Sequence, residues 1–351
     1  MTNIGALWTL VVWGEAIRER KATFPALFQS KAVSRNPLFD KLASGSGIGT
    51  TVPLLRDITD TSDEVQKEST APVANNGIGG ALQYFPIMNR VTKFSATALS
   101  KQLSGADPLG EVLNQINDTR LKQRQKTFIS LLRGLFASAG AAGLAGALTD
   151  CRYVNGAGNE IFIEDGAAAT DANLFNPDVF IGTKGLMGEL GDSLRDGVLL
   201  MHSTVKSRLE VLDSLNFKKT VLASELPFTI DSYRDIPVIV SDSLCRAGTA
   251  TGKVFDTYLL ASSTVGYGEK AQAGDVADVA SLQYFHDKEA NDEFIYDRTR
   301  HMQGIAGTRY KGAPADPNNG PTNAELQDRT AWELAFSSAK LCGAVCVRTN
   351  G

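Results

Sequence analysis

Cysteine is scarce and scattered in this sequence, which has four cysteines among 351 residues. They are too few and too far apart for the disulfide framework of a secreted protein, so a reducing compartment is expected. The four are Cys151, Cys245, Cys342 and Cys346. Cys342 and Cys346 fall in a stretch with the pattern of a strand and have no second pair of metal ligands nearby, so we interpret them as small buried hydrophobic residues.

An excess of positive charge is also missing. Asp and Glu number 39 against 35 Lys and Arg, which gives a formal net charge of −4. No Lys/Arg cluster is longer than KQRQK at 122–126, whereas a dedicated nucleic-acid-binding protein would be more basic. We therefore expect neither sequence-specific DNA binding nor a strongly basic patch.

The chain lacks a hydrophobic run that could span a membrane. No run approaches roughly 18 apolar residues, so we expect no contact with a membrane. The short apolar run 4–12 has no basic residues before it and no small-residue cleavage site after it, and charged residues follow at once. This is not the pattern of a secretory signal.

Catalytic motifs are absent in the form that their chemistry requires. The stretch GTATGK at 248–253 has three residues between its glycines, where a phosphate-binding loop needs four. Ser203 follows a strand-like run, but Met201 and Val205 stand where the nucleophile elbow of a hydrolase requires glycine. The three histidines, His202, His286 and His301, form no HExxH motif, and we interpret His202 as a hydrogen-bonded structural residue. We predict that the protein is not an enzyme and holds no metal or cofactor.

The middle of the chain contains a clear succession of strands and helices. Its composition, 43% hydrophobic and 21% charged, is that of a globular protein, and its length allows two or more compact domains. The apolar run 198–201 predicts a buried strand, and apolar residues at helical spacing over 205–212 predict a helix with Ser203 as its N-cap. Residues 236–240 predict a second strand, and TYLLASSTVGYG at 257–268 predicts a third.

Two unusual segments precede this region. Residues 45–98 begin Gly-rich, pass through an almost wholly polar centre and return to alternating strand-like sequence. This predicts a long hairpin with too few apolar residues to bury both of its faces. Asp107 as N-cap and Pro108 at the first helical position then open an apolar pattern of helical spacing that runs to Phe136, which predicts a helix of about 42 Å.

The order of these elements resembles one family. A helix ending in LGD, a strand ending in MHS, an amphipathic helix, the strand IPVIVSD and the strand TYLLASSTVGYG resemble the axial domain of tailed-bacteriophage major capsid proteins with the Hong Kong 97-type fold. MHS and IPVIVSD carry most of the specificity, while the order of the other elements extends the resemblance to nearly the whole chain. The resemblance implies an α+β fold with an N-terminal arm (1–47), an extended β-hairpin loop (48–98), a peripheral domain (99–171 and 281–351) with a long spine helix (108–136), and an axial domain (172–280).

The resemblance also implies a function. The protein would be a structural subunit that self-assembles, as pentamers and hexamers, into the icosahedral head shell of a tailed bacteriophage around its double-stranded DNA. The implied partners are a portal, a separate scaffold and possibly decoration proteins, and the implied locations are the virion and, during assembly, the host cytoplasm. The alternatives are an encapsulin-type compartment, which shares the fold and encloses an enzyme, and a soluble α/β enzyme with an unrecognised site.

Candidate contacts between subunits lie in the arm and in the hairpin. The candidates are Trp8, Trp13, Phe24 and Phe28 in the arm and Arg56, Asp57, Lys67 and Glu68 in the hairpin. The four aromatic residues fit a short helix packed on its own subunit as well as an arm that lies across a neighbour. Some capsids with this fold form covalent links from Lys to Asn between subunits, but we interpret Lys67 as a solvated charge and predict no crosslink.

Overall fold

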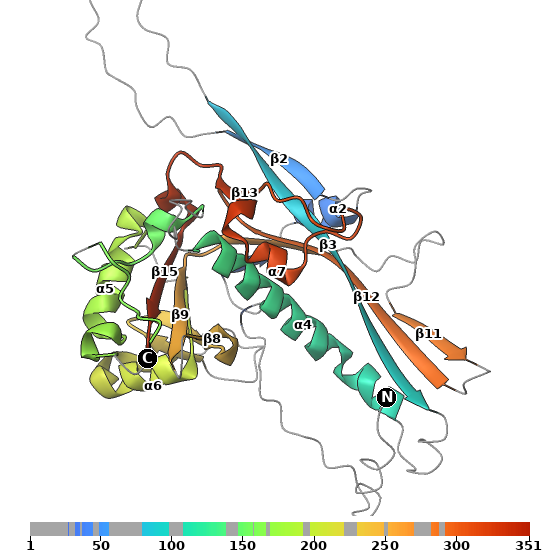
Figure 1. Ribbon diagram of the computed structural model, residues 1–351, viewed down its shortest axis with the longest axis horizontal. Helices are drawn as coiled ribbons and strands as arrows, with labels where there is room; N and C mark the ends of the chain where they lie inside the picture. The colour runs from blue at the N-terminus through green and yellow to red at the C-terminus, as the bar shows by residue number, and fades with distance from the viewer. Residues whose placement is uncertain are drawn as a thin grey trace, which may run out of the picture.

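A computed structural model gives the structure of the chain. It describes residues 27, 32–35, 37–44, 49–55, 79–97, 108–137, 147–156, 158–165, 169–191, 197–220, 230–248, 252–269, 282–287 and 292–351. Two large sheets form the framework of the described part of the chain. Figure 1 shows one sheet packed among helices on one side of the molecule, a long ribbon of strands on the other, and a long helix running beside the ribbon.

The first sheet has six strands in the order β1-β10-β12-β3-β2, with β11 paired to the free part of β12. Its strands are β1 (Val33–Arg35), β2 (Gly49–Leu55), β3 (Gly80–Thr97), β10 (Val265–Glu269), β11 (Leu282–Asp287) and β12 (Asp292–Ile305). The 18 residues of β3 pair first with β2, over Gly80–Pro86, and then with β12, over Ile87–Thr97. At 3.3 Å per residue β3 spans about 59 Å, so the sheet is a long ribbon rather than a compact layer.

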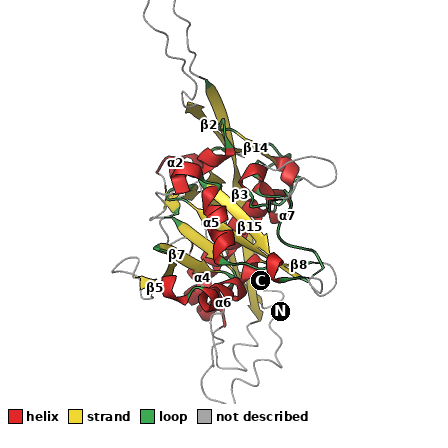
Figure 2. Cartoon of the chain, turned by 90° about the vertical axis from the view of Figure 1, so that its left-hand side faces the viewer, coloured by secondary structure: helices red, strands yellow, loops and turns green. Residues whose placement is uncertain are grey.

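The second sheet has seven strands in the order β15-β9-β4-β7-β6-β5, with β8 also paired to β9. Its strands are β4 (Val198–Met201), β5 (Phe217–Thr220), β6 (Ile230–Tyr233), β7 (Ile236–Val240), β8 (Cys245–Ala247), β9 (Lys253–Leu260) and β15 (Ala344–Thr349). The predicted strands 198–201 and 236–240 are confirmed, and they lie side by side in parallel. Figure 2 shows helix α5 (Pro177–Gly185) in front of these strands, with α6 (Ser203–Leu212) at one end.

Helix α4 (Pro108–Leu135) confirms the predicted long helix, with 28 residues. Its C-terminal half buries Phe128, Leu131, Leu132 and Leu135 in the main hydrophobic core, which also contains residues of the seven-stranded sheet. The remaining elements are α2 (Pro37–Ser44), α7 (Asn323–Leu326), β13 (Thr308–Tyr310), β14 (Trp332–Leu334) and seven 3-10 turns among the described residues, of which η2 (Thr149–Cys151), η7 (Ser214–Asn216) and η10 (Ala339–Cys342) are used below.

The prediction of one strand over 257–268 is wrong. The segment is two strands, β9 and β10, which belong to different sheets. Between them Ser263 has a φ of 56°, in the left-handed region, which ends the extended conformation and turns the chain from one sheet to the other. The last strand, β15, lies at an edge of the seven-stranded sheet and pairs with β9.

Candidate assembly surface

The predicted inter-subunit residues lie outside the described part of the chain. They are Trp8, Trp13, Phe24, Phe28, Arg56, Asp57, Lys67 and Glu68, and Asp107, the predicted helix cap, lies outside it as well. Two surfaces of the described strands and helices expose large apolar side chains.

The predicted hairpin is confirmed by the antiparallel pairing of β2 with β3. Figure 1 shows the β2 end of this ribbon pointing away from the rest of the subunit. Among the described residues of the hairpin, a small cluster of Phe85 and Ile87 is buried with Met302, and Phe39 and Val52 pack against it. Leu82 is 55% exposed. The hairpin thus has little core of its own, as its sequence predicted.

At its other end the ribbon carries an aromatic face. Residues directly opposite each other in antiparallel strands share a face, and the register pairs Phe285 with Phe294 and Tyr296 with Lys93. The rings of Phe285 and Phe294 stack with centroids 6.3 Å apart. The Lys93 ammonium lies 3.8 Å from the Phe294 centroid, and Arg298 lies 5.4 Å from that of Tyr296, so both cations cover rings of β12.

The opposite face of the same strands is the one toward α4. Asp297 belongs to it, because the Arg120 Nε of α4 donates to its carboxylate at 3.0 Å. Ile295 lies two positions from Asp297 along β12, so its side chain points to the same face. Tyr284 of β11 lies opposite Ile295. Tyr284 is 61% exposed and Phe285, on the other face, is 54% exposed. Strand β11 therefore exposes one aromatic ring on each face.

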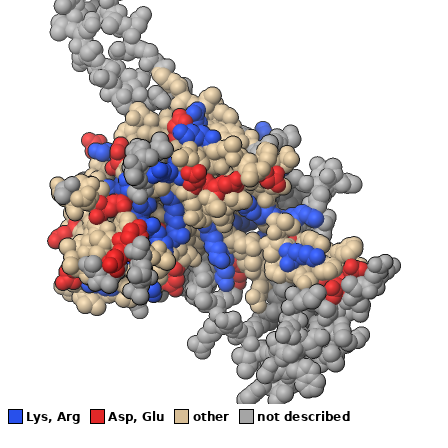
Figure 3. Space-filling model, viewed as in Figure 1, with Lys and Arg blue, Asp and Glu red and all other residues tan. Residues whose placement is uncertain are grey.

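Ion pairs hold the middle of α4 on the ribbon. The hydrogen bond to Asp297 raises the pKa of Arg120 above its ordinary value, which favours the charged form and strengthens the pair. One turn later Arg124 pairs with Glu269 of β10. Near the C-terminal end of α4, Arg133 instead pairs with Asp256 of β9, in the seven-stranded sheet, at 3.0 Å. Figure 3 shows Lys and Arg side chains gathered over the middle of the face that carries α4, with Asp and Glu side chains close by. Much of the local positive charge is therefore neutralised within the subunit.

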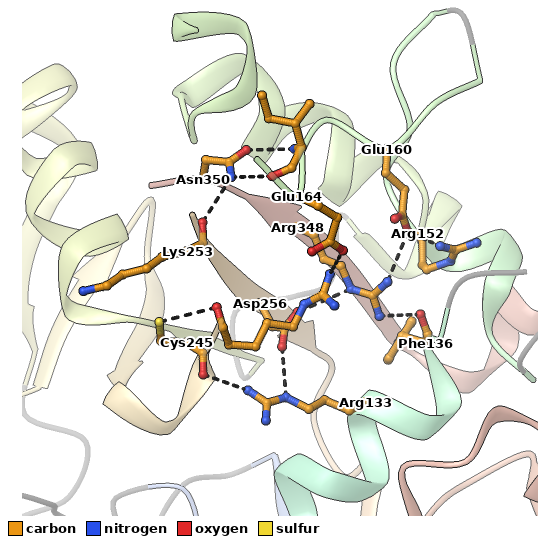
Figure 4. A network of polar contacts seen from close by, with 12 residues as sticks. Arg133, Phe136, Arg152, Glu160, Glu164, Cys245, Lys253, Asp256, Arg348 and Asn350 are labelled. Atoms are coloured by element: carbon orange, nitrogen blue, oxygen red, sulfur yellow. Dashed lines mark hydrogen bonds and ion pairs between the residues drawn. The ribbon is translucent and has the colours of Figure 1, made fainter. Parts of the chain in front are cut away.

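A buried ionic network joins α4 to the edge of the seven-stranded sheet (Figure 4). Arg348 of β15 lies 3.3 Å from both Glu160 and Asp256, and it donates to the carbonyl of Phe136, at the end of α4, at 2.7 Å. Arg152 also pairs with Glu160. Because Arg348 and Asp256 are both buried, each depends on the other for its charge to be tolerated inside the protein.

Ser203, His202 and Asp242 lie close together but not in the arrangement of a nucleophilic triad. The Ser203 hydroxyl donates to the Asp242 carboxylate at 2.7 Å, so its proton is directed away from the imidazole. The Nδ1 atom of His202 accepts from the Thr204 N–H at 3.1 Å, which makes His202 the N-cap of α6. The structural interpretation of His202 is confirmed, whereas the prediction of Ser203 as N-cap is wrong.

The cysteines are free and mostly buried. Burial raises the pKa of Cys151 to about 11 and those of Cys342 and Cys346 to about 12, so these thiols stay protonated at neutral pH. Cys342 lies in η10 and Cys346 in β15, so the prediction that they share a strand is wrong, although their interpretation as buried residues is confirmed. In the described ranges no group of His, Cys, Asp and Glu side chains can hold a metal ion, and no helix is long and apolar enough to cross a membrane.

A second exposed apolar area was missed by the sequence analysis. Val211, at the end of α6, is 84% exposed, and Leu215, in η7, is 92% exposed. The apolar pattern of α6 places Val205 and Leu209 inside and leaves Val211 on the outer side of the helix. The departure of Val211 from the helical period was the signal that could have identified it.

Comparisons with known proteins identify the fold. The sequence matches no protein-family model and no curated protein. The structure is similar to that of the capsid of Ralstonia phage GP4, with a TM-score of 0.59, 9% identity and 97% of both chains covered. It is also similar to the capsid of Helicobacter pylori bacteriophage KHP30, with a TM-score of 0.54, 8% identity and 95% and 94% of the two chains covered. For the capsid of Cyanophage P-SCSP1u the TM-score is 0.50 at 13% identity, over 83% and 88%. The predicted α+β fold is confirmed, and the chain has the fold of these bacteriophage capsid proteins.

Proposed function

We propose that this protein is the major capsid subunit of a tailed bacteriophage and builds the icosahedral head shell around double-stranded DNA. The observation that carries the proposal is the likeness to the Ralstonia phage GP4 capsid, which covers 97% of both chains. Because the likeness covers nearly the whole chain, the unmatched part is too small to form a separate catalytic domain. The proposed role is therefore structural.

The exposed surfaces support assembly. The β2–β3 hairpin has little core of its own, and β11 exposes aromatic rings on both faces. Single exposed hydrophobic residues are normal on a monomer, but adjacent ones on a strand at the edge of a sheet are a typical site of association. In a shell, many individually weak contacts of this kind add up because each subunit is held by several neighbours.

The predicted parts of the subunit have separate roles in this proposal. The arm (1–47) and the hairpin loop (48–98) contact neighbours through Trp8, Trp13, Phe24, Phe28, Arg56, Asp57, Lys67 and Glu68. The axial domain (172–280) meets its copies around fivefold and sixfold axes, and the peripheral domain (99–171 and 281–351) carries the long helix α4. These assignments follow from the resemblance of the sequence and from the position of α4 after the hairpin.

The remaining partners belong to the same proposal. A portal, a separate scaffold and possibly decoration proteins act with the shell, in the host cytoplasm during assembly and in the virion afterwards. DNA is enclosed without sequence-specific contact, which agrees with the formal net charge of −4. A role other than catalysis agrees with the geometry at Ser203, where the hydroxyl proton points to a carboxylate rather than to His202.

The test is to purify the full chain and examine it by negative-stain electron microscopy and sedimentation velocity. We expect closed shells, or capsomers of five and six subunits. A double variant, Val211→Ser with Leu215→Ser, is compared with a matched variant at nearby exposed polar positions, Ser207→Ala with Ser214→Ala. The comparison separates a specific loss of association from a general effect of surface substitution. A stable monomer as the only species at all concentrations would contradict the proposal.

A further inference from the structure

The end of helix α6 and the turn η7 expose three large apolar side chains that lie close together in the sequence. Val211 is 84% exposed, Leu212 is 49% exposed and Leu215 is 92% exposed. Val205 and Leu209 form the buried side of the helix, and at about 100° per residue Val211 points away from them. Single exposed hydrophobic residues are normal on a monomer, whereas neighbouring ones of this size are typical of a surface that another molecule covers.

This exposed segment is not a loose loop, because Asp213 ties it to the seven-stranded sheet. The Asp213 carboxylate accepts hydrogen bonds from the Tyr233 hydroxyl of β6 and from the Asn216 side chain of η7, each at 2.7 Å. The Arg234 guanidinium lies 3.5 Å from the same carboxylate. The hydrogen bond from Tyr233 lowers the pKa of Asp213 below its ordinary value, which keeps the carboxylate charged at neutral pH. Leu215, between Asp213 and Asn216, is therefore held in a fixed position.

The turn between β6 and β7 fixes the same region from the other side. Arg234 and Asp235 are its two central residues, and their φ angles of 49° and 64° lie in the left-handed region that asparagine and glycine usually occupy. Two contacts hold this costly conformation in place. The Arg234 N–H donates to the Asn216 carbonyl at 3.1 Å, and Lys218 pairs with Asp235 at 3.3 Å. A partner that binds here does not have to order the surface first, which favours binding.

The charges of this region are balanced. We refer to residues 211–218 and 233–236 as the α6 corner. Its charged side chains are paired within the subunit, Lys218 with Asp235 and Arg234 with Asp213. Adjacent copies of one domain carry the same charges, so a contact surface with an excess of one sign would repel itself around a ring. The α6 corner has no such excess, and it therefore fits a second copy of this chain rather than a partner of strong opposite charge.

The apolar area of the corner is too small to hold two copies together by itself. A stable interface buries about 800 Å² on each partner, with about 20 to 30 residues a side, whereas the corner offers three large apolar side chains. A contact of this size becomes effective when it is repeated in a ring, where each copy is held by two neighbours. We propose that the α6 corner packs against the axial domain of a second copy of this chain and buries Val211, Leu212 and Leu215 there. The proposal rests on the proposed shell function and specifies the surface through which axial domains meet.

Thiol reactivity tests whether a second copy covers the corner. Leu215→Cys places a thiol at the most exposed of the three positions, and the wild-type protein, with its native cysteines, gives the background rate. The variant is assembled as a minority among wild-type chains, with no other protein present, and treated with a small maleimide. We expect the introduced thiol to react about tenfold or more slowly than in dilute, unassembled subunits, because the reaction requires solvent access.

Ser337→Cys is the matched control, since Ser337 is an exposed position outside the corner. Its thiol should keep at least half of its unassembled rate, by the same assay. Equal rates at Leu215→Cys before and after assembly would overturn the proposal and leave the corner open to a different protein. Equal slowing of both thiols would show general exclusion of the reagent and would also overturn the assignment to the corner.

Electron microscopy of the same samples tests the function separately. Shells in which the thiol of Leu215→Cys stays reactive would support the function and overturn the corner contact. A protected thiol in an oligomer other than a shell would contradict the function and leave the corner contact standing. Subunits that stay monomeric at every concentration would contradict both.

Discussion

The seven-stranded sheet and the long ribbon differ in how much of their surface they bury within one chain. All the side chains of β4 and β15 are buried, and so are those of β9 except the first. The ribbon leaves Leu82, Val91 and Phe285 exposed along β3 and β11. The sheet buries most of its side chains, whereas the ribbon leaves apolar side chains exposed in the described part of the chain. Stability and assembly therefore depend on different residues, and substitutions can separate them.

The buried network offers the largest expected effect on stability. Arg348→Met leaves Glu160 and Asp256 with one cation fewer in a buried site, so we expect the free energy of unfolding to fall by about 4 kcal/mol. Arg309→Met removes a pair with Glu333 in which both side chains are partly exposed, and it should cost less than about 1 kcal/mol. Urea denaturation measures both. Equal losses of stability in the two variants would show that the buried network of Arg348 contributes no more than an exposed ion pair.

Truncation of buried and exposed leucines tests the contrast directly. Leu200→Ala in β4 opens a cavity in the core and should lower the free energy of unfolding by about 3 kcal/mol. Leu82→Ala on the ribbon should change it by less than about 0.5 kcal/mol. Sedimentation velocity should show the reverse order for assembly, with Leu82→Ala impaired while its melting temperature is that of the wild type. A Leu82→Ala protein that melts early would place the ribbon in the subunit core.

Two N-terminal deletions distinguish the arm from the core. Removal of residues 1–26 takes away Trp8, Trp13 and Phe24 but keeps Leu27, which is fully buried. We expect that deletion to leave the melting temperature unchanged and to prevent complete shells. Removal of residues 1–30 also removes Leu27 and should lower the free energy of unfolding by about 2 kcal/mol. Identical melting of the two deletions would show that Leu27 contributes nothing to the core.

Much of the finished sheet could be predicted from sequence, because its signals are local. Apolar runs defined β4 and β7, and Pro108 at the start of a helical pattern defined α4. The break between β9 and β10 could not be predicted, since Ser263 takes a left-handed conformation that a sequence usually marks with glycine. His202 is likewise not among the usual helix caps.

The open surfaces were harder to predict for a different reason. Aromatic residues in a strand pattern favour burial, and the exposure of Tyr284 and Phe285 depends on which segments lie against β11, which is a long-range property. The sequence predicted one part of the candidate site, a long hairpin with too few apolar residues for a core of its own. The pairing of β2 with β3 confirms that hairpin. The individual contact residues, such as Trp8 and Lys67, stay predictions because they lie outside the described residues.

The last contrast concerns the pH dependence of stability at His301, which lies at the junction of α4 with the ribbon. Burial, followed by the charges of Arg124 and Arg90, lowers the pKa of this histidine to about 3, while Glu269 lies opposite it in the sheet. The unfolded chain binds the proton below its ordinary pKa of about 6.5 and the folded chain does not, so stability is full above pH 6.5 and is lost as the pH falls toward 3. The expected slope is up to about 1.4 kcal/mol per pH unit, measured by urea denaturation between pH 7 and pH 4. His301→Gln should flatten that slope, whereas His286→Gln, at an exposed position of β11, should not. A slope that persists in His301→Gln would mean that acid destabilises the protein elsewhere than at the junction of α4 with the ribbon.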